Sequence, residues 1–292
     1  MAGKFWPNLD DDLINSIVKT SLDGGINWFD TAEVYGNGAS EKALAKALSH
    51  KGQKPGQIMV ATKWWPMFRS ASNILKTIDQ RIDALNPFPI DLYQVHQPWG
   101  FSNEKAEMEA MVRLVKENKI GYVGVSNFSV TQMRSAWKVL HKHGIPLVSN
   151  QVRFNLLDRK IESNGILQTA KELGISIIAY SPLAQGLVTG KFHENPELLK
   201  NIGMRKHSSQ FKPRGLEKSN PLIKTIQELA IKYEVTSSQV ALNWLIYFHG
   251  DTVVAIPGAT RESHAKENIG TMNFRLSDED MSLLDKESAI FK

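Results

Sequence analysis

Short runs of apolar, β-favouring residues recur along the chain, and longer segments with the hydrophobic spacing of amphipathic helices lie between them. Some runs are apolar on both faces, as Ile58-Met59-Val60-Ala61 is, which is typical of strands buried between two layers. The pattern predicts seven strands, at residues 26–31, 58–63, 91–96, 121–126, 147–152, 175–181 and 252–257. It predicts helices at residues 11–22, 40–49, 71–85, 103–117, 129–143 and 165–173.

Several helix starts carry their own signals. Ser40 followed by Glu41 suits an N-cap and a first helical turn. Ser129-Val130-Thr131-Gln132 and Thr236-Ser237-Ser238-Gln239 match the capping-box pattern. These signals support helices that begin close to the predicted positions.

Strands that alternate with helices predict an α/β fold with parallel strands. Seven such strands in 292 residues favour a (β/α)8 TIM barrel over an open doubly wound sheet. No G-x-G-x-x-G follows an early strand, which argues against a Rossmann domain. We therefore expect one barrel domain over residues 1–292, with a long polar loop at 186–219 and a C-terminal helix at 277–288.

An eight-stranded barrel needs a strand before its first helix, and that helix is predicted to begin at Asp11. Residues 1–7 are too few and too poor in β-formers to supply a full strand. We expect the first strand and the N-terminal hairpin to be missing or truncated.

Composition excludes several classes of protein. Hydrophobic residues make up 42% and charged residues 22%, values typical of a globular chain. The absence of cysteine excludes disulfides, thiolate zinc, iron–sulfur clusters and cysteine nucleophiles, and no metal site is predicted. There is no signal-peptide pattern and no apolar run of about 18 residues, so we expect a cytoplasmic protein without membrane association.

The net charge of +5 is spread along the chain without a Lys/Arg block. This charge is only weak evidence for nucleic-acid binding, because it suits an anionic small-molecule ligand equally well, and we do not predict a nucleic-acid partner. The oligomeric state cannot be read from the sequence.

Ionisable residues end three successive predicted strands: Asp30, Lys63 and His96. Tyr35 follows the first of these strands in the next loop. The carboxyl ends of barrel strands meet on one face, where active sites are built. Isolated charges there would be costly unless they were paired, so we expect these residues to meet across the barrel mouth.

At these residues the chain resembles the aldo-keto reductase superfamily. The motifs, all in family order, are Asp30-Thr31-Ala32-Glu33-Val34-Tyr35-Gly36, Ala61-Thr62-Lys63, Val95-His96, Gly124-Val125-Ser126-Asn127-Phe128, Asn150-Gln151, Ala179-Tyr180-Ser181-Pro182-Leu183, Ile256-Pro257-Gly258 and Glu267-Asn268. The resemblance implies a (β/α)8 barrel that binds NADP(H) without a Rossmann domain, and a catalytic tetrad of Asp30, Tyr35, Lys63 and His96.

The implied activity is the NADPH-dependent reduction of an aldehyde or ketone to an alcohol. No side chain supplies a hydride, so a nicotinamide cofactor is required. Tyr35 would donate the proton, with its pKa lowered by Lys63, and Asp30 would hold Lys63 charged and oriented. His96 would orient the carbonyl group of a small-molecule substrate.

The resemblance also implies a set of cofactor residues. Ser126, Asn127 and Gln151 would hold the nicotinamide carboxamide, Tyr180 would stack on that ring, and Ser181, Leu183 and Gln185 would surround the pyrophosphate. The adenosine end would lie among Gly258, Thr260, Arg261, His264, Glu267 and Asn268. Because the guanidinium of Arg261 suits a 2′-phosphate, we expect NADP(H) in preference to NAD(H).

Each residue also has an ordinary structural interpretation. A lone lysine at a strand end usually extends to solvent, and a lone histidine after an apolar run usually belongs to the core. A chance occurrence of four such residues at strand ends, in the order of the family, is improbable. Trp64, Trp65 and Trp99 follow strands and either shape a substrate pocket or pack. The alternative function is a cofactor-binding regulatory or partner subunit with little or no turnover.

Overall fold

The computed structural model describes residues 10–292. The chain divides into two compact units, which are described separately below. The first contains the chain up to Val152 together with Ile166–Ile178 and Gly258–Lys266. The second contains Arg153–Gly165, Ala179–Pro257 and Glu267–Lys292.

Parallel strands form the centre of the first unit. They are β1 (Trp28–Asp30), β2 (Met59–Trp64), β3 (Leu92–Val95), β4 (Tyr122–Ser126) and β5 (Leu147–Arg153), and each pairs with the next in parallel. The seven-stranded sheet continues with β6 (Ser176–Tyr180) and β7 (Val253–Ala255), so that strand order equals sequence order. All four residues of β3 are buried, as the apolar run predicts.

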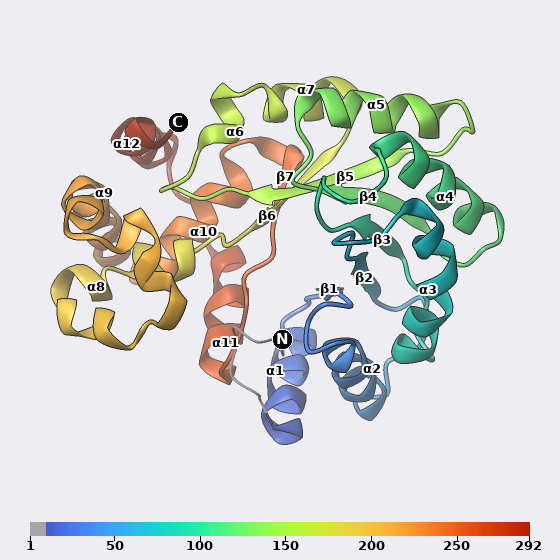
Figure 1. Cartoon of the computed structure of the whole chain (residues 1–292). Coiled ribbons are helices and arrows are strands. Elements are labelled where there is room, and N and C mark those ends of the chain that lie inside the picture. The colour runs from blue at the N-terminus through green and yellow to red at the C-terminus, as the bar shows by residue number, and fades with distance from the viewer. Residues whose placement is uncertain (1–9) are drawn as a thin grey trace. The chain divides into compact units, whose positions relative to one another are not determined.

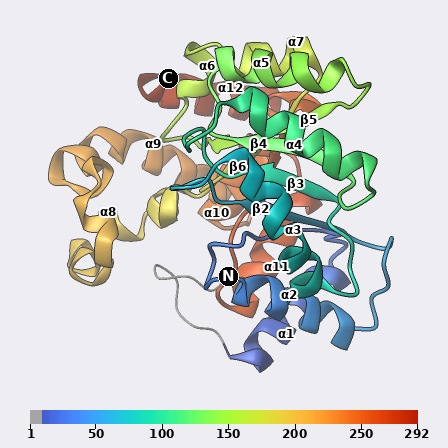
Figure 2. The same cartoon turned by 45° about the vertical axis from the view of Figure 1, so that its right-hand side comes forward.

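Helices connect these strands and lie on their outer side (Figures 1 and 2). They are α1 (Asp11–Asp23), α2 (Ala39–His50), α3 (Ala71–Leu85), α4 (Glu104–Lys116), α5 (Val130–His141) and α7 (Ile166–Leu173). Each buries one apolar stripe, as α3 does with Ile74 and Ile78. Parallel strands with helices between them confirm the predicted α/β class. Within residues 10–292 no strand precedes α1. Residues 1–7, which are predicted to be too few for the opening strand, lie outside the described range.

The second unit is mostly helical. It contains α6 (Lys160–Ser163), α8 (Lys191–Glu194), α9 (Pro213–Lys232), α10 (Ser237–Tyr247), α12 (Asp278–Ser288) and the end of α11 (Glu262–Gly270). Short 3-10 turns lie between them: η1 (Ala184–Thr189), η2 (Pro196–Asn201), η3 (Gly203–His207), η4 (Ser209–Phe211), η5 (Gly250–Thr252), η6 (Thr271–Asn273) and η7 (Ala289–Phe291).

Residues 186–219 are therefore not an irregular loop. Short helical turns occupy much of the segment, and α9 begins inside it at Pro213. Leu187, Phe192 and Phe211 are buried, and the rings of Phe192 and Phe211 meet edge to face at 5.5 Å. These apolar anchors among many polar residues explain the local order.

Two predicted capping boxes are confirmed, at Ser129 before α5 and at Thr236 before α10. The predicted N-cap at Ser40 is wrong. Gly38, with φ of +86°, holds that position, and Ser40 lies inside α2, where it is buried and accepts a hydrogen bond from Thr31 Oγ1 (2.9 Å). A glycine reaches this left-handed backbone without steric cost, so the helix begins earlier.

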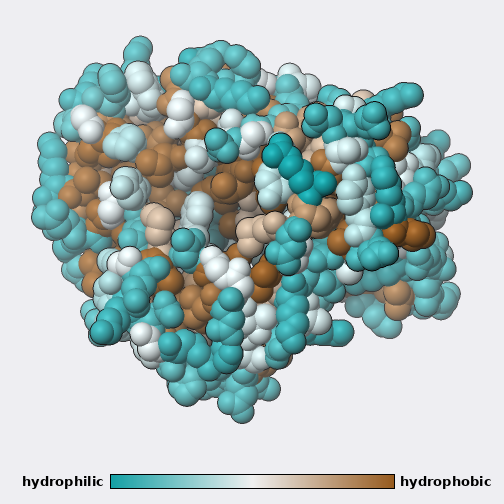
Figure 3. Space-filling view, turned by 180° about the vertical axis from the view of Figure 1, so that it is seen from behind, coloured by the Kyte–Doolittle hydropathy of each residue, from teal (hydrophilic) through white to brown (hydrophobic). Residues whose placement is uncertain are grey.

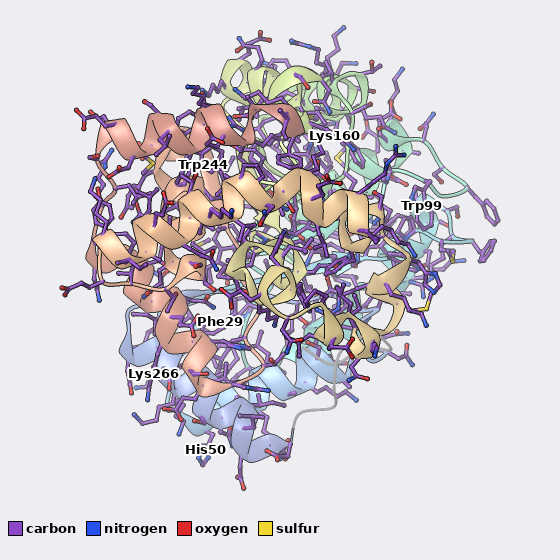
Figure 4. The ribbon with its side chains drawn as sticks, turned by 90° about the vertical axis from the view of Figure 1, so that its left-hand side faces the viewer. Phe29, His50, Trp99, Lys160, Trp244 and Lys266 are labelled. Carbon is purple, nitrogen blue, oxygen red and sulfur yellow. The ribbon has the colours of Figure 1, made fainter. Side chains whose placement is uncertain are left out.

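A buried ionic cluster lies in the second unit. Trp244 of α10, labelled in Figure 4, is fully buried, and the guanidinium of Arg159 lies 4.7 Å from the centre of its ring. Arg159 also pairs with Glu162 and Asp285, each at 2.5 Å. Two carboxylates and an aromatic face thus compensate the burial of this charge.

The face shown in Figure 3 carries many polar residues, with apolar residues gathered between them. In the described part of the chain no helix combines the length and apolar character needed to cross a bilayer.

Candidate functional site

The carboxyl ends of neighbouring strands bring the four predicted catalytic residues together in the first unit. Asp30 is the last residue of β1, Lys63 lies near the end of β2, and His96 directly follows β3. Tyr35 lies in the loop between β1 and α2. Parallel pairing of β1 with β2 and of β2 with β3 places these ends side by side.

Lys63 is fully buried and its charge is compensated locally. Its Nζ forms an ion pair with Asp30 Oδ1 and donates a hydrogen bond to the Thr31 carbonyl oxygen (2.8 Å). Asp30 Oδ2 accepts hydrogen bonds from Gln151 Nε2 (3.0 Å) and Gln94 Nε2 (3.3 Å). A buried ammonium is tolerated only with such partners, and here they also fix its position.

The ring of Tyr35 lies beside both Lys63 and His96. Lys63 Nζ is 5.5 Å from the ring centre, and the His96 imidazole meets the ring edge to face at 5.8 Å. Within residues 10–292 the Tyr35 hydroxyl forms no hydrogen bond. The phenol is thus close to an ammonium and an imidazole and able to accept another partner.

The pKa of Tyr35 is raised above its ordinary value, first by burial. Lys63 lowers this pKa, and Asp30 raises it further. Lys63 thus acts in the predicted direction, but the net pKa rises, because the loss of hydration around the phenolate outweighs the attraction of the ammonium.

His96 is buried and uncharged. Burial, and then the nearby Lys63 charge, lower the pKa of His96 to about 3. Its Nδ1 is buried without a hydrogen-bond partner among the described residues. A neutral imidazole at neutral pH can form hydrogen bonds to a ligand without adding a second positive charge to the site.

Two tryptophans continue this cluster toward the surface. Trp65 meets the His96 ring edge to face at 5.0 Å, and Trp99 meets Trp65 in the same way at 5.3 Å. Trp99, labelled in Figure 4, is 44% exposed. Trp64 instead is fully buried and donates a hydrogen bond from Nε1 to Asn73 Oδ1 (3.0 Å), so it is a packing residue.

The predicted cofactor residues belong to both units. The first unit holds Ser126, Asn127, Gln151, Gly258, Thr260, Arg261 and His264. Ser126 Oγ donates to the Gln151 carbonyl oxygen (2.8 Å), and Asn127 adopts a left-handed backbone with φ of +60°. Arg261 is exposed and has no ion-pair partner in the part of the chain that the structure describes.

The second unit holds Tyr180, Ser181, Leu183, Gln185, Glu267 and Asn268. After β6 three residues other than glycine have positive φ: Ser181 (+50°), Ala184 (+46°) and Gln185 (+56°). Asn155 Nδ2 supports this turn by donating to the Ser181 carbonyl oxygen (2.9 Å). Such backbone conformations cost about 1–3 kcal/mol each and cluster at functional sites.

Sequence reasoning missed two residues at the tetrad. Gln94 is fully buried and contacts Asp30, and Glu33 is buried within the same loop that carries Tyr35. A polar residue within the apolar run Leu92–Val95 is a signal that could have revealed Gln94. Glu33 lies within the motif Asp30–Gly36, but its role depends on partners from distant segments, which the motif does not reveal.

Comparisons with known proteins agree with this geometry. The sequence profile described as "Aldo/keto reductase family" matches residues 1–289. A chloroplastic pyridoxal reductase of Arabidopsis thaliana is 32% identical over an alignment of 292 positions. The alignment covers 94% of this chain and 76% of that protein. The solved structure of a glycerol dehydrogenase from Gluconobacter oxydans is similar with a TM-score of 0.86 and 29% identity, covering 99% of this chain and 89% of that one.

A third similar protein is an aldo-keto reductase from Klebsiella pneumoniae, solved in complex with NADPH. Its TM-score is 0.73 at 24% identity, over 94% of this chain and 84% of that one. Together with the strand order, these likenesses confirm the predicted (β/α)8 barrel with its opening strand missing from the described residues.

Proposed function

The chain belongs to the aldo/keto reductase family, and from this premise we propose that it reduces an aldehyde or ketone to an alcohol with NADPH. The observation that carries the proposal is the buried Lys63–Asp30 pair beside the phenol of Tyr35 and the neutral imidazole of His96. This arrangement suits proton donation to a carbonyl oxygen. A buried ion pair adds little net stability compared with apolar packing, which supports a functional role for this pair.

Each unit, taken by itself, offers residues that suit one part of a nicotinamide dinucleotide phosphate. Ser126 and Asn127 supply amide and hydroxyl groups for a carboxamide, and the strained turn at Ser181 and Gln185 suits the approach of a pyrophosphate. The guanidinium of Arg261 is exposed and has no ion-pair partner among residues 10–292, so it suits a 2′-phosphate, which favours NADPH over NADH. When bound, the nicotinamide supplies a hydride to the carbonyl carbon.

Tyr35 acts as the proton donor in this proposal. Its raised pKa keeps the phenol protonated at neutral pH. As negative charge develops on the carbonyl oxygen, the phenolic proton moves to that oxygen. Lys63 then stabilises the phenolate, and Asp30 holds the ammonium in place until solvent returns a proton to Tyr35.

His96 positions the substrate. Because its pKa is about 3, the imidazole remains neutral, so it orients the carbonyl oxygen by a hydrogen bond and does not transfer the proton. Trp65 holds the imidazole from the side, and Trp99 extends the apolar wall. We propose that this wall favours carbonyl compounds with an aromatic or apolar part.

The test is an assay with NADPH and a panel of carbonyl compounds. The panel contains benzaldehyde, pyridoxal and glyceraldehyde, of which the last two follow from the names of the similar proteins. The oxidation of NADPH is followed by absorbance. Tyr35→Phe should lower kcat by about 10²–10⁴-fold without weakening NADPH binding, because only the proton donor is lost.

Tyr93→Phe is the matched control. Tyr93 is fully buried, and its hydroxyl has no hydrogen-bond partner among the described residues, so this variant should keep wild-type activity. Full activity of Tyr35→Phe would refute the assigned proton donor. Tight NADPH binding without turnover on the whole panel would instead favour the alternative, a regulatory or partner subunit.

A further inference from the structure

The carboxylate of Glu33 is buried near the tetrad and contacts three residues of the first unit, two in the loop after β2 and one in α3. Glu33 Oε1 accepts hydrogen bonds from the backbone N–H of Trp65 (2.5 Å) and from Arg69 Nη1 (2.7 Å). Glu33 Oε2 accepts from Arg81 Nη1 (2.9 Å). Glu33 is buried, so these charge-assisted bonds are shielded from water and stronger than surface pairs.

The backbone of Glu33 fixes the loop that carries Tyr35. Its N–H donates to the Lys63 carbonyl oxygen (3.4 Å), and its own carbonyl oxygen accepts from the N–H of Gly38 (2.8 Å). Tyr35 therefore lies on a short turn that is closed at Glu33 and attached to the strand that carries Lys63. A shift of Glu33 would change the distance between the phenol and the ammonium.

The side chain of Glu33 also supports the position of His96, through Trp65. It fixes the backbone of Trp65, and the indole of Trp65 packs against the His96 imidazole with ring centres 5.0 Å apart. Glu33 thus contacts the segments that carry Tyr35 and Lys63 through its backbone, and the support of His96 through its carboxylate. Catalysis requires that Tyr35, Lys63 and His96 keep a fixed arrangement relative to one another.

The negative charge of Glu33 is matched by two arginines. Arg81 is buried and also pairs with Glu41, from its Nε to Oε2 at 3.2 Å. Glu41 Oε1 in turn accepts from Thr62 Oγ1 (2.6 Å). A neutral amide in place of Glu33 would give up an acceptor for one of its three donors and leave arginine charge unmatched.

From these contacts we propose that Glu33 is a positioning residue, which holds the Tyr35 loop and Trp65 so that Tyr35 and His96 keep their places around Lys63. The proposal rests on the proposed reductase function for its kinetic effect, but its structural effect can be measured without turnover.

The experiment compares Glu33→Gln with Glu41→Gln. Both remove a buried carboxylate paired with Arg81, but among the described residues the side chain of Glu41 bonds to Thr62 and Arg81 and forms no hydrogen bond or ion pair with Tyr35 or Trp65. For each variant we would measure kcat, KM, the pH profile of kcat, the melting temperature and hydrogen exchange of residues 34–38 and 64–66.

Glu33→Gln should lower kcat at least about tenfold, with a smaller change in KM, because misplacing catalytic groups by a fraction of an ångström is costly. The alkaline limb of its pH profile should move by about half a pH unit or more, since Tyr35 and Lys63 change their separation. Hydrogen exchange of residues 34–38 and 64–66 should accelerate. Glu41→Gln should lose stability but keep the wild-type kcat, pH profile and exchange in these segments.

Equal losses of kcat in the two variants, in proportion to their stability, would overturn the proposal, as would unchanged exchange in Glu33→Gln. If Glu33→Gln does not fold, Glu33→Asp takes its place, because aspartate keeps the negative charge on a side chain that is one methylene group shorter. A loss of kcat with faster exchange in Glu33→Asp supports the proposal, and wild-type values overturn it. A wild-type protein without turnover would refute the reductase function, while the exchange data would still decide the role of Glu33.

Discussion

The neutral state of His96 makes the stability of this protein depend on pH in a way that one substitution should remove. His96 has a native pKa of about 3, compared with 6.5 for an unperturbed histidine. Between these values the unfolded chain binds a proton at this residue and the folded chain does not. The unfolded state therefore holds more protons, and the stability contributed by this residue decreases as the pH falls below 6.5.

The size of the effect follows from the two pKa values of His96. At pH 5 protonation of an ordinary histidine stabilises the unfolded chain by about 2 kcal/mol, whereas protonation of His96 stabilises the folded chain by almost nothing. At pH 7 the corresponding difference is only about 0.2 kcal/mol. His96→Gln has no titrating group at this position. Its unfolding free energy relative to wild type should therefore improve by about 2 kcal/mol when the pH is lowered from 7 to 5.

The assay is urea unfolding of both proteins at pH 7 and pH 5, without nucleotide, followed by tryptophan fluorescence. The carboxylates titrate equally in both proteins, so their contributions cancel in the difference. His50→Gln is the control, because the same substitution is made at an exposed histidine at the end of α2 (Figure 4). Its difference from wild type should stay within about 0.5 kcal/mol at both pH values.

One result would refute this reasoning. If the free-energy difference between wild type and His96→Gln is the same at pH 5 as at pH 7, then His96 binds protons equally in the folded and the unfolded chain, and folding does not lower its pKa. The imidazole would then become charged at pH 5, and its assignment as a residue that stays neutral through burial would fail.

Two further substitutions test the packing of each unit. Gly124→Ala should destabilise the first unit by about 1–3 kcal/mol in urea unfolding, because an added Cβ would lie 2.3 Å from Ser149 Oγ; unchanged stability would show that β4 can move. Arg159→Met should cost about 3–5 kcal/mol at pH 7, because it leaves the Glu162 and Asp285 carboxylates without their buried cation. Arg159 helps to lower the pKa of both carboxylates, so this loss should shrink as the pH falls below about 4, and a loss that does not change with pH would contradict the pairing.

Period and spacing in the sequence determined the class of fold and most of the tetrad. The apolar runs fixed where strands lie, because a residue buried on both faces of a parallel sheet must be apolar. Strand ends at Asp30, Lys63 and His96 then placed three ionisable groups on one face, because parallel strands all end on the same side. The capping boxes at Ser129 and Thr236 were predictable for a similar reason, since their hydrogen bonds are local.

Tertiary structure decided what depends on burial and on distant partners. The pKa of Tyr35 rises where local reasoning predicted a fall, because hydration lost in the folded state is invisible in sequence. Segment 186–219 is ordered because Phe192 and Phe211 meet across it. Glu33 takes its partners from Trp65, Arg69 and Arg81, which are 32 to 48 residues away. Contacts over such separations exist only once the chain has folded, so no local pattern records them.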